Sequence, residues 1–206
     1  METWGEKFSV KGVTWGPTSL KVKDNDRDIV LYPRYDYIKW SSNVKIFQKV
    51  PGKRKKQILY IEQHLEFLNL YEVIDVETKK SIGTIRYHFG NWEIVDTHDN
   101  YFIINKDSPL RKIFAFGHTP YYIADGQSRF FGEIQKTSEG VTPIFFSYEI
   151  DFSFDKEKKL NRSLGLAVFI LFVLKSESIF SMEQTKRLLS MNAKKIFKSK
   201  KKVPHA

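Results

Sequence analysis

The chain has 206 residues, a formal net charge of +10, 41% hydrophobic residues and 15% aromatic residues. Such a chain can bury one sizeable core, which argues against two small domains and against disorder over most of its length. It has no cysteine, which excludes disulfides, thiolate metal sites and cysteine nucleophiles. Met1 to Val10 lacks a continuous apolar run, so we expect no signal peptide and a cytoplasmic location.

The positive charge is concentrated in two blocks, at residues 53–56 and in the tail from Met191 to Ala206. These blocks carry four and six cations and account for the whole net charge, so the rest of the chain is expected to be close to neutral. Their members are Lys53, Arg54, Lys55, Lys56, Lys194, Lys195, Lys198, Lys200, Lys201 and Lys202. Such blocks attract polyanions, although a charged hairpin tip and a solubilising tail would explain them equally well.

The first third of the chain predicts short strands at residues 8–13, 20–22, 28–32, 35–40 and 44–50. Lys23 to Asp26 is typical of a turn, because Asp and Asn side chains bond their own backbone. Pro33 is expected at a sheet edge or a break, since proline cannot donate to a ladder. Pro51 and Gly52 begin a loop that carries the first basic block, and Gln57 to His64 returns from it. This pattern predicts a hairpin with a positively charged tip.

A loose repeat follows at residues 71–85, 92–104 and 121–134. Each copy has an aromatic-led strand, an aspartate that opens a turn (Asp75, Asp96 or Asp125) and a second strand. This pattern predicts β-hairpins in which the aspartate accepts backbone N–H groups. The irregular spacing argues against a solenoid or propeller, and several meandering hairpins favour a barrel or sandwich.

Two residue types recur at matching places in the repeat. Gly83 and Gly132 are expected to allow a bulge or close strand packing. Glu72 and Glu93 are expected on the solvent face of their strands.

The C-terminal third combines a strand at residues 142–154 with an apolar segment at Leu164 to Leu174. That segment is apolar on every face and about half as long as the roughly 20 residues of a membrane span. A helix of this kind is more often buried in a protein. We therefore expect a mainly β fold, a closed antiparallel β-barrel around a central hydrophobic helix at residues 162–176.

A basic amphipathic helix is expected from Met182 to Phe197, with Ser181 and Gln184 forming a capping box. It could lie on a membrane surface or pack on the barrel exterior. The predicted organisation is a barrel domain at residues 1–180, followed by a basic helical tail at residues 181–206.

Several of these segments resemble the Tubby C-terminal-like domains, in particular the phospholipid scramblase and LURP-one-related families. The resemblance rests on the strand at residues 149–153, on Arg162 with the apolar helix after it, and on the hairpins at residues 71–85 and 92–96. It implies a closed barrel of about a dozen strands threaded by one hydrophobic helix. The chain lacks the cysteine-rich stretch of the scramblases, and its helix is shorter than their terminal anchor.

No catalytic signature is present in the sequence. Gly-x-Ser-x-Gly and phosphate-loop motifs are absent, and no histidine is paired at i,i+4 with a second ligand. Asp96, His98 and Asp99 share one predicted turn and could hold a metal, but such residues are ordinary at hairpin tips. We expect no enzyme activity, no cofactor and no metal.

The leading interpretation is a binding or scaffold module that associates with anionic phospholipid or phosphoinositide membranes through the two basic blocks. The protein would then be cytoplasmic and peripheral to the membrane. The alternative is a nucleic-acid-binding or regulatory protein that uses the same charges, with surface aromatics such as Trp40 stacking on bases. A third class, an enzyme or lipid transporter that uses the barrel interior, is disfavoured because the predicted helix fills that interior.

Overall fold

Antiparallel pairing between neighbours along the chain builds the whole sheet. The structure, a computed structural model, describes residues 4–13, 20–27, 29–35, 43–49, 51–64, 69–88, 91–106, 120–137 and 145–176. Its strands are β1 (Lys7–Val13), β2 (Lys21–Asp24), β3 (Ile29–Tyr35), β4 (Val44–Lys49), β5 (Lys56–Gln63), β6 (Leu70–Asp75), β7 (Lys80–His88), β8 (Asn91–Asp96), β9 (Tyr101–Lys106), β10 (Tyr121–Asp125), β11 (Phe130–Lys136) and β12 (Phe145–Asp151).

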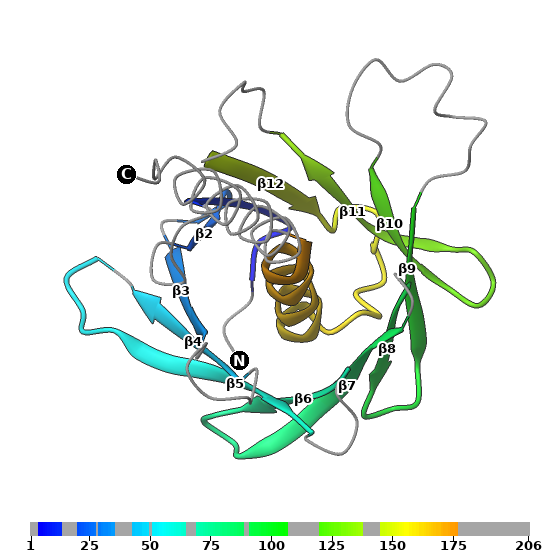
Figure 1. Cartoon of the computed structure of the whole chain (residues 1–206), viewed down its shortest axis with the longest axis horizontal. Coiled ribbons are helices and arrows are strands. Elements are labelled where there is room, and N and C mark those ends of the chain that lie inside the picture. Colours follow the sequence, from blue (N-terminus) through cyan, green and yellow to red (C-terminus); the bar gives the residue numbers. More distant parts are fainter. Residues whose placement is uncertain are drawn as a thin grey trace, which may run out of the picture.

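The twelve strands form a closed barrel, because β1 also pairs with β12. Figure 1 shows the ring of strands, in which β1 and β12, the first and last strands of the sequence, are neighbours. The prediction of a mainly β, closed antiparallel barrel is confirmed. All three hairpins of the repeat are present, as β6–β7, β8–β9 and β10–β11.

Residues 162–176 form a helix, as the apolar run predicted. Every residue from Leu164 to Leu174 is buried and belongs to one hydrophobic core with the inward side chains of the strands. The Phe172 ring lies 4.7 Å from the Tyr121 ring and 6.2 Å from the Trp92 ring. In the view of Figure 1 the helix lies inside the ring of strands. Within the part of the chain that the structure describes, no helix is long and apolar enough to cross a bilayer.

Two glycines let the helix approach its surroundings closely. A Cβ on Gly83 would lie 2.5 Å from the Val95 carbonyl oxygen and 2.7 Å from Leu164, and Gly83 has a φ of +152°. A Cβ on Gly165 would lie 2.7 Å from the Phe152 ring. The expected bulges are present, because the pairing register shifts next to Gly83 in β6–β7 and next to Gly132 in β10–β11. Any larger side chain at Gly83 would clash and strain the backbone.

One turn design recurs at a single end of the barrel, here called the turn end, where each even-numbered strand finishes. Asp96, Asp125 and Asp155 each accept the backbone N–H of the residue four positions later, at 2.9, 3.0 and 2.9 Å. The third residue after each aspartate has a positive φ of 59°, 59° and 52°. This is the three-residue hairpin loop with a left-handed last position. The third copy joins β12 to the helix, so the same turn that makes hairpins also starts the helix.

The structure corrects the expectation for Pro33, and several other expectations concern residues that it does not describe. Pro33 lies inside β3, opposite Ile46 of β4, so the predicted break is wrong. Its predicted edge position fits, because the described pairing of β3 with β2 ends at Leu31 and the missing N–H removes no ladder bond on that side. The predicted strand beyond Tyr35, the helix at residues 182–197 and the basic tail lie outside the described residues.

Candidate anionic-surface interface

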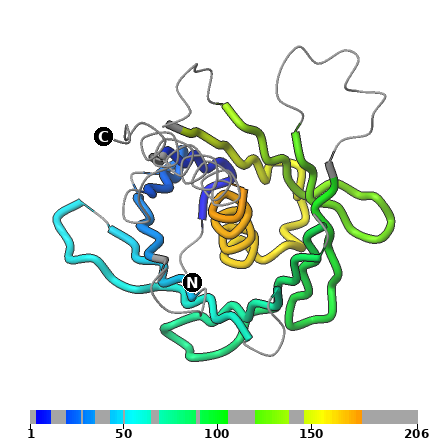
Figure 2. The backbone as a smooth tube through the Cα atoms, in the orientation of Figure 1, coloured from blue at the N-terminus to red at the C-terminus, as the bar shows by residue number. Residues whose placement is uncertain are grey.

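The first basic block forms the hairpin tip between β4 and β5. Residues 51–56 are all exposed, and Figure 2 shows this cyan hairpin extending away from the ring. The Lys55 ammonium lies 3.8 Å from the centre of the Tyr32 ring, and Lys56 forms an ion pair with Glu77 at 2.9 Å. Lys53 and Arg54 project from the tip as exposed cations. The predicted charged hairpin tip is therefore present, with two of its cations already held by protein groups.

A larger set of cations lies on the outer surface of β1–β4, which we call the basic face. Exposed and half-buried side chains alternate along these strands with buried ones, so that one set points away from the core. No outward residue of β1–β4 that the structure describes is acidic. The cations of the basic face are Lys7, Lys11, Lys21, Lys23, Arg34, Lys45 and Lys49.

The registers place some of these cations directly against each other. Lys11 of β1 lies opposite Lys21 of β2, and Arg34 of β3 lies opposite Lys45 of β4. Like charges directly opposite each other across two strands are destabilising. The basic face therefore carries a repulsion that an external anion would relieve.

Two aromatic rings sit among the cations of the basic face. Tyr32 lies opposite Phe47 in the β3–β4 pairing, and both side chains are half-buried. The Arg34 guanidinium lies 5.0 Å from the centre of the Phe47 ring, and Lys55 covers Tyr32. These cation–π contacts tie the hairpin tip to the basic face.

Acidic residues mark the boundary of the basic face on the β12 side. Lys7 forms an ion pair with Asp151 of β12 at 3.0 Å, and Asp151 lies opposite Glu133 of β11. The hydrogen bond and the charge of Asp151 raise the pKa of Lys7. Burial alone would raise the pKa of Asp151, but hydrogen bonds from Ser153 and Lys7 outweigh it and hold the pKa below 3.8. Glu149 of β12 also lies beside β1, opposite Ser9, so the acidic side chains begin where the basic face ends.

The basic face connects the two ends of the barrel. The hairpin tip lies at the turn end, whereas Lys11, Lys21 and the Arg34–Lys45 pair lie toward the other end. The helix starts at the turn end and runs to that other end, where Lys175 lies 5.7 Å from the Tyr71 ring centre. The tail lysines at 194, 195, 198 and 200–202 lie outside the described residues.

The other residues singled out in the sequence serve the fold. The Asp96 carboxylate accepts the backbone N–H groups of His98 and Asn100 at 2.8 and 2.9 Å, so it is committed to its turn. Across the described ranges, no group of three His, Asp or Glu residues could hold a metal. Glu72 and Glu93 are half-buried, with nitrogens of His64 and Arg86 at 3.5 and 4.0 Å. Trp40 lies outside the described residues.

Sequence reasoning missed the basic face, because each strand contributes only one to three cations and neutral residues separate them. The signal that could have found it is the absence of acids at alternate positions of four successive strands. No family model, curated protein or solved structure matches this chain.

Proposed function

We propose that the protein is a non-enzymatic binding module that associates peripherally with anionic phospholipid membranes. The basic face is the main contact, the hairpin tip at residues 53–56 extends it at one end, and the tail lysines add to it. The observation that carries the proposal is that Lys11 lies opposite Lys21 and Arg34 opposite Lys45, with no acid among the outward residues of β1–β4 that the structure describes. An anionic surface would supply the negative charge that balances these cations.

The expected strength of this association follows from the number of cations in contact. Each basic residue near an anionic membrane contributes about 1 kcal/mol. The contacts are exposed, so salt screens them over a Debye length of about 8 Å at physiological ionic strength. Binding is therefore reversible and weakens as salt is added.

Lipid is favoured over nucleic acid by the state of the two rings on the basic face. Single-stranded nucleic acid binds largely by stacking its bases on aromatic side chains. Here Lys55 covers Tyr32 and Arg34 covers Phe47, so the rings are already engaged. A membrane of anionic head groups needs only the cations.

We also propose that the chain belongs to the Tubby C-terminal-like domains, with the helix at the centre of the barrel. Its support is that the helix contacts strands from several sides of the ring. Leu164 packs at Gly83 of β7, and the Phe172 ring lies near rings of β8, β10 and β12. In this arrangement residues 1–180 form the barrel domain and residues 181–206 the basic tail.

Co-sedimentation with vesicles tests the basic face. The wild type is expected to bind phosphatidylcholine vesicles that contain phosphatidylserine and not vesicles of phosphatidylcholine alone. The double variant Lys11→Glu/Lys45→Glu places an acid opposite Lys21 and opposite Arg34. We expect it to bind more weakly by about 2 to 4 kcal/mol, on the order of 30- to 1000-fold.

A matched control separates the basic face from net charge. The variant Lys79→Glu/Lys156→Glu makes the same charge change at exposed turn positions outside the basic face and should keep most of the binding. Equal losses in the two variants, or equal wild-type binding to the two kinds of vesicle, would refute the proposal. Tighter, salt-sensitive binding to a single-stranded oligonucleotide than to the anionic vesicles would favour the nucleic-acid alternative.

A further inference from the structure

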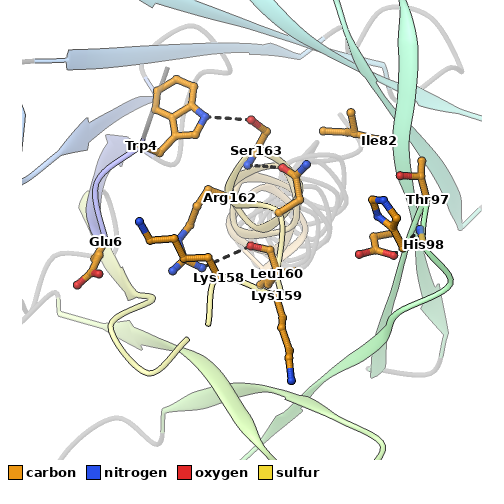
Figure 3. A pocket seen from close by; sticks show the side chains of 12 residues that line it. Trp4, Glu6, Ile82, Thr97, His98, Lys158, Lys159, Leu160, Arg162 and Ser163 are labelled. Atoms are coloured by element: carbon orange, nitrogen blue, oxygen red, sulfur yellow. Dashed lines mark hydrogen bonds between the residues drawn. The ribbon is translucent and has the colours of Figure 1, made fainter. Parts of the chain in front are cut away.

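A cavity of about 390 Å³ opens at the turn end of the barrel, beside the start of the helix. Its walls come from the N-terminal segment, β7, the β8–β9 turn and the turn that precedes the helix. Figure 3 shows Ser163 at the start of the helix, with Trp4 on one side of it and Thr97 and His98 on the other. Sites for small molecules are typically concave, of about 300–1000 Å³, with apolar walls and a few polar groups.

The apolar wall of this cavity is fixed in place. The Trp4 indole N–H donates a hydrogen bond to the Ser163 hydroxyl oxygen at 2.9 Å, and its ring lies edge-on to Phe8. Ile82 is half-buried and packs against the core, and Leu160 is buried. This wall is therefore preformed for an apolar group.

Most charged groups around the cavity are already committed to the protein. Arg162 and Asp155 form a buried ion pair at 2.8 Å, and Lys159 pairs with Glu157 at 2.6 Å. The first free amides of the helix also have an acceptor, because the N–H groups of Ser163 and Leu164 donate to the Asn161 side chain.

Three other ionisable side chains at the cavity take part in no ion pair among the described residues. The ion pairs among the described residues do not include Lys158, His98 or Glu6, and all three line the cavity. Lys158 is presented by the left-handed position of its turn, at a φ of 52°. The cavity therefore offers one permanent cation, one imidazole and one carboxylate next to an apolar wall.

We infer that this cavity binds a small amphiphilic monoanion, and the inference does not depend on the membrane proposal. The apolar body lies against Trp4 and Ile82, and the acid group meets Lys158, while His98 lines the cavity on the other side of the helix start. Glu6 at the cavity disfavours a second negative charge on the ligand. The charges and the wall thus select for one acid group on an apolar body.

Two fluorescent probes of nearly the same shape test this inference. The probe 1-anilinonaphthalene-8-sulfonate is a monoanion, and N-phenyl-1-naphthylamine is its neutral counterpart. We expect saturable, one-to-one binding of the anion, weakened at least about tenfold by Lys158→Gln, because the variant loses a charged contact with the acid group. Affinity for the neutral probe should stay the same. Lys156→Gln is the control, since Lys156 is exposed in the same turn and does not line this cavity.

Filling the cavity gives a second, independent readout. His98→Trp should reduce affinity for both probes, whereas Gln127→Trp should not. His98 and Gln127 are the second residues after Asp96 and Asp125, and each donates its backbone N–H to that aspartate, at 2.8 and 2.9 Å. Unsaturable binding, or equal affinity of wild type, Lys158→Gln and His98→Trp for the anion, would overturn the inference. The variant Lys11→Glu/Lys45→Glu should bind the anionic probe like the wild type, so this test and the vesicle test can fail separately.

Discussion

The turns at one end of the barrel and the basic face along its side use charge in opposite ways. In the turns, Asp96, Asp125 and Asp155 each accept at least two hydrogen bonds. On the basic face, Lys11 meets Lys21 across two strands and no acid lies among the outward residues described there. The turn aspartates stabilise the fold, whereas the opposed Lys11 and Lys21 repel each other and remain available to a partner.

The turn aspartates show how a carboxylate is stabilised in its charged form. Burial alone would raise the pKa of Asp125, but the Arg129 backbone N–H, the Arg129 guanidinium and the Gln127 N–H together lower it below 3.8. Apart from the Lys7–Asp151 pair, the ion pairs among the described residues include no cation of the basic face. The comparison predicts that changes in the turns alter stability first and changes on the basic face alter binding first.

The largest effect on stability is expected for Asp155→Ala. The Asp155 carboxylate accepts two backbone N–H groups and pairs with Arg162, whose side chain is only 11% exposed. Removing one partner of a buried pair costs about 3–5 kcal/mol. Thermal and denaturant unfolding should show this loss, while vesicle binding below the melting temperature stays unchanged. Glu157→Ala, which breaks the exposed pair with Lys159, should cost at most about 1 kcal/mol. Equal losses of unfolding free energy in the two variants would contradict the expected difference between the buried and the exposed ion pair.

A smaller effect of opposite sign is expected for Lys21→Glu. It turns a repulsive pair with Lys11 into an attractive one, which should raise the free energy of unfolding by about 0.2–1 kcal/mol. The gain should shrink at high salt, because exposed charges are screened. Lys23→Glu is the matched control, since Lys23 lies opposite Ser9 and Val30 and not opposite a cation. A gain of the same size there would show that the opposed pair is not the cause.

The smallest effect concerns pH at the edge of the basic face. The pKa of Asp151 is lowered from 3.8 in the folded protein. Its contribution to stability is therefore present above the unfolded pKa and is lost as the pH falls through the lower folded pKa. The difference in melting temperature between wild type and Asp151→Asn should stay constant near neutrality and shrink below pH 3.8. Lys7→Met should weaken this dependence. A difference that does not change with pH would contradict the assignment.

The strands, the hairpin repeat and the apolar helix could all be predicted because each has a local cause. The alternation of Phe146, Tyr148 and Ile150 with Ser147 and Glu149 is typical of a strand, and all three apolar side chains are buried in β12. Asp75, Asp96 and Asp125 marked turns because a short carboxylate can accept backbone N–H groups nearby. These rules act within a few residues and need no knowledge of the partner strand.

The basic face and the cavity could not be predicted, because both depend on contacts between distant segments. Lys11 becomes significant only when the register sets it against Lys21, and Arg34 only when it meets Lys45. Trp4 gave no sign in the sequence that it would bond to Ser163 at the start of the helix. The continuation of β3 past Pro33 was missed for the same reason, since it depends on where the pairing with the neighbouring strand ends.

The closure of the ring by β1 and β12 also governs how the protein is made. A ribosome releases the first strand long before the last one, so β1 waits with an unpaired edge while the rest of the chain emerges. Long-range pairings of this kind form slowly and expose unpaired strands to aggregation in the meantime. The lysines along β1 and β2 repel neighbouring nascent chains during this interval, because a charged strand edge is a poor template for another strand. The lysines that repel one another in the folded barrel therefore reduce aggregation of the incompletely synthesised chain.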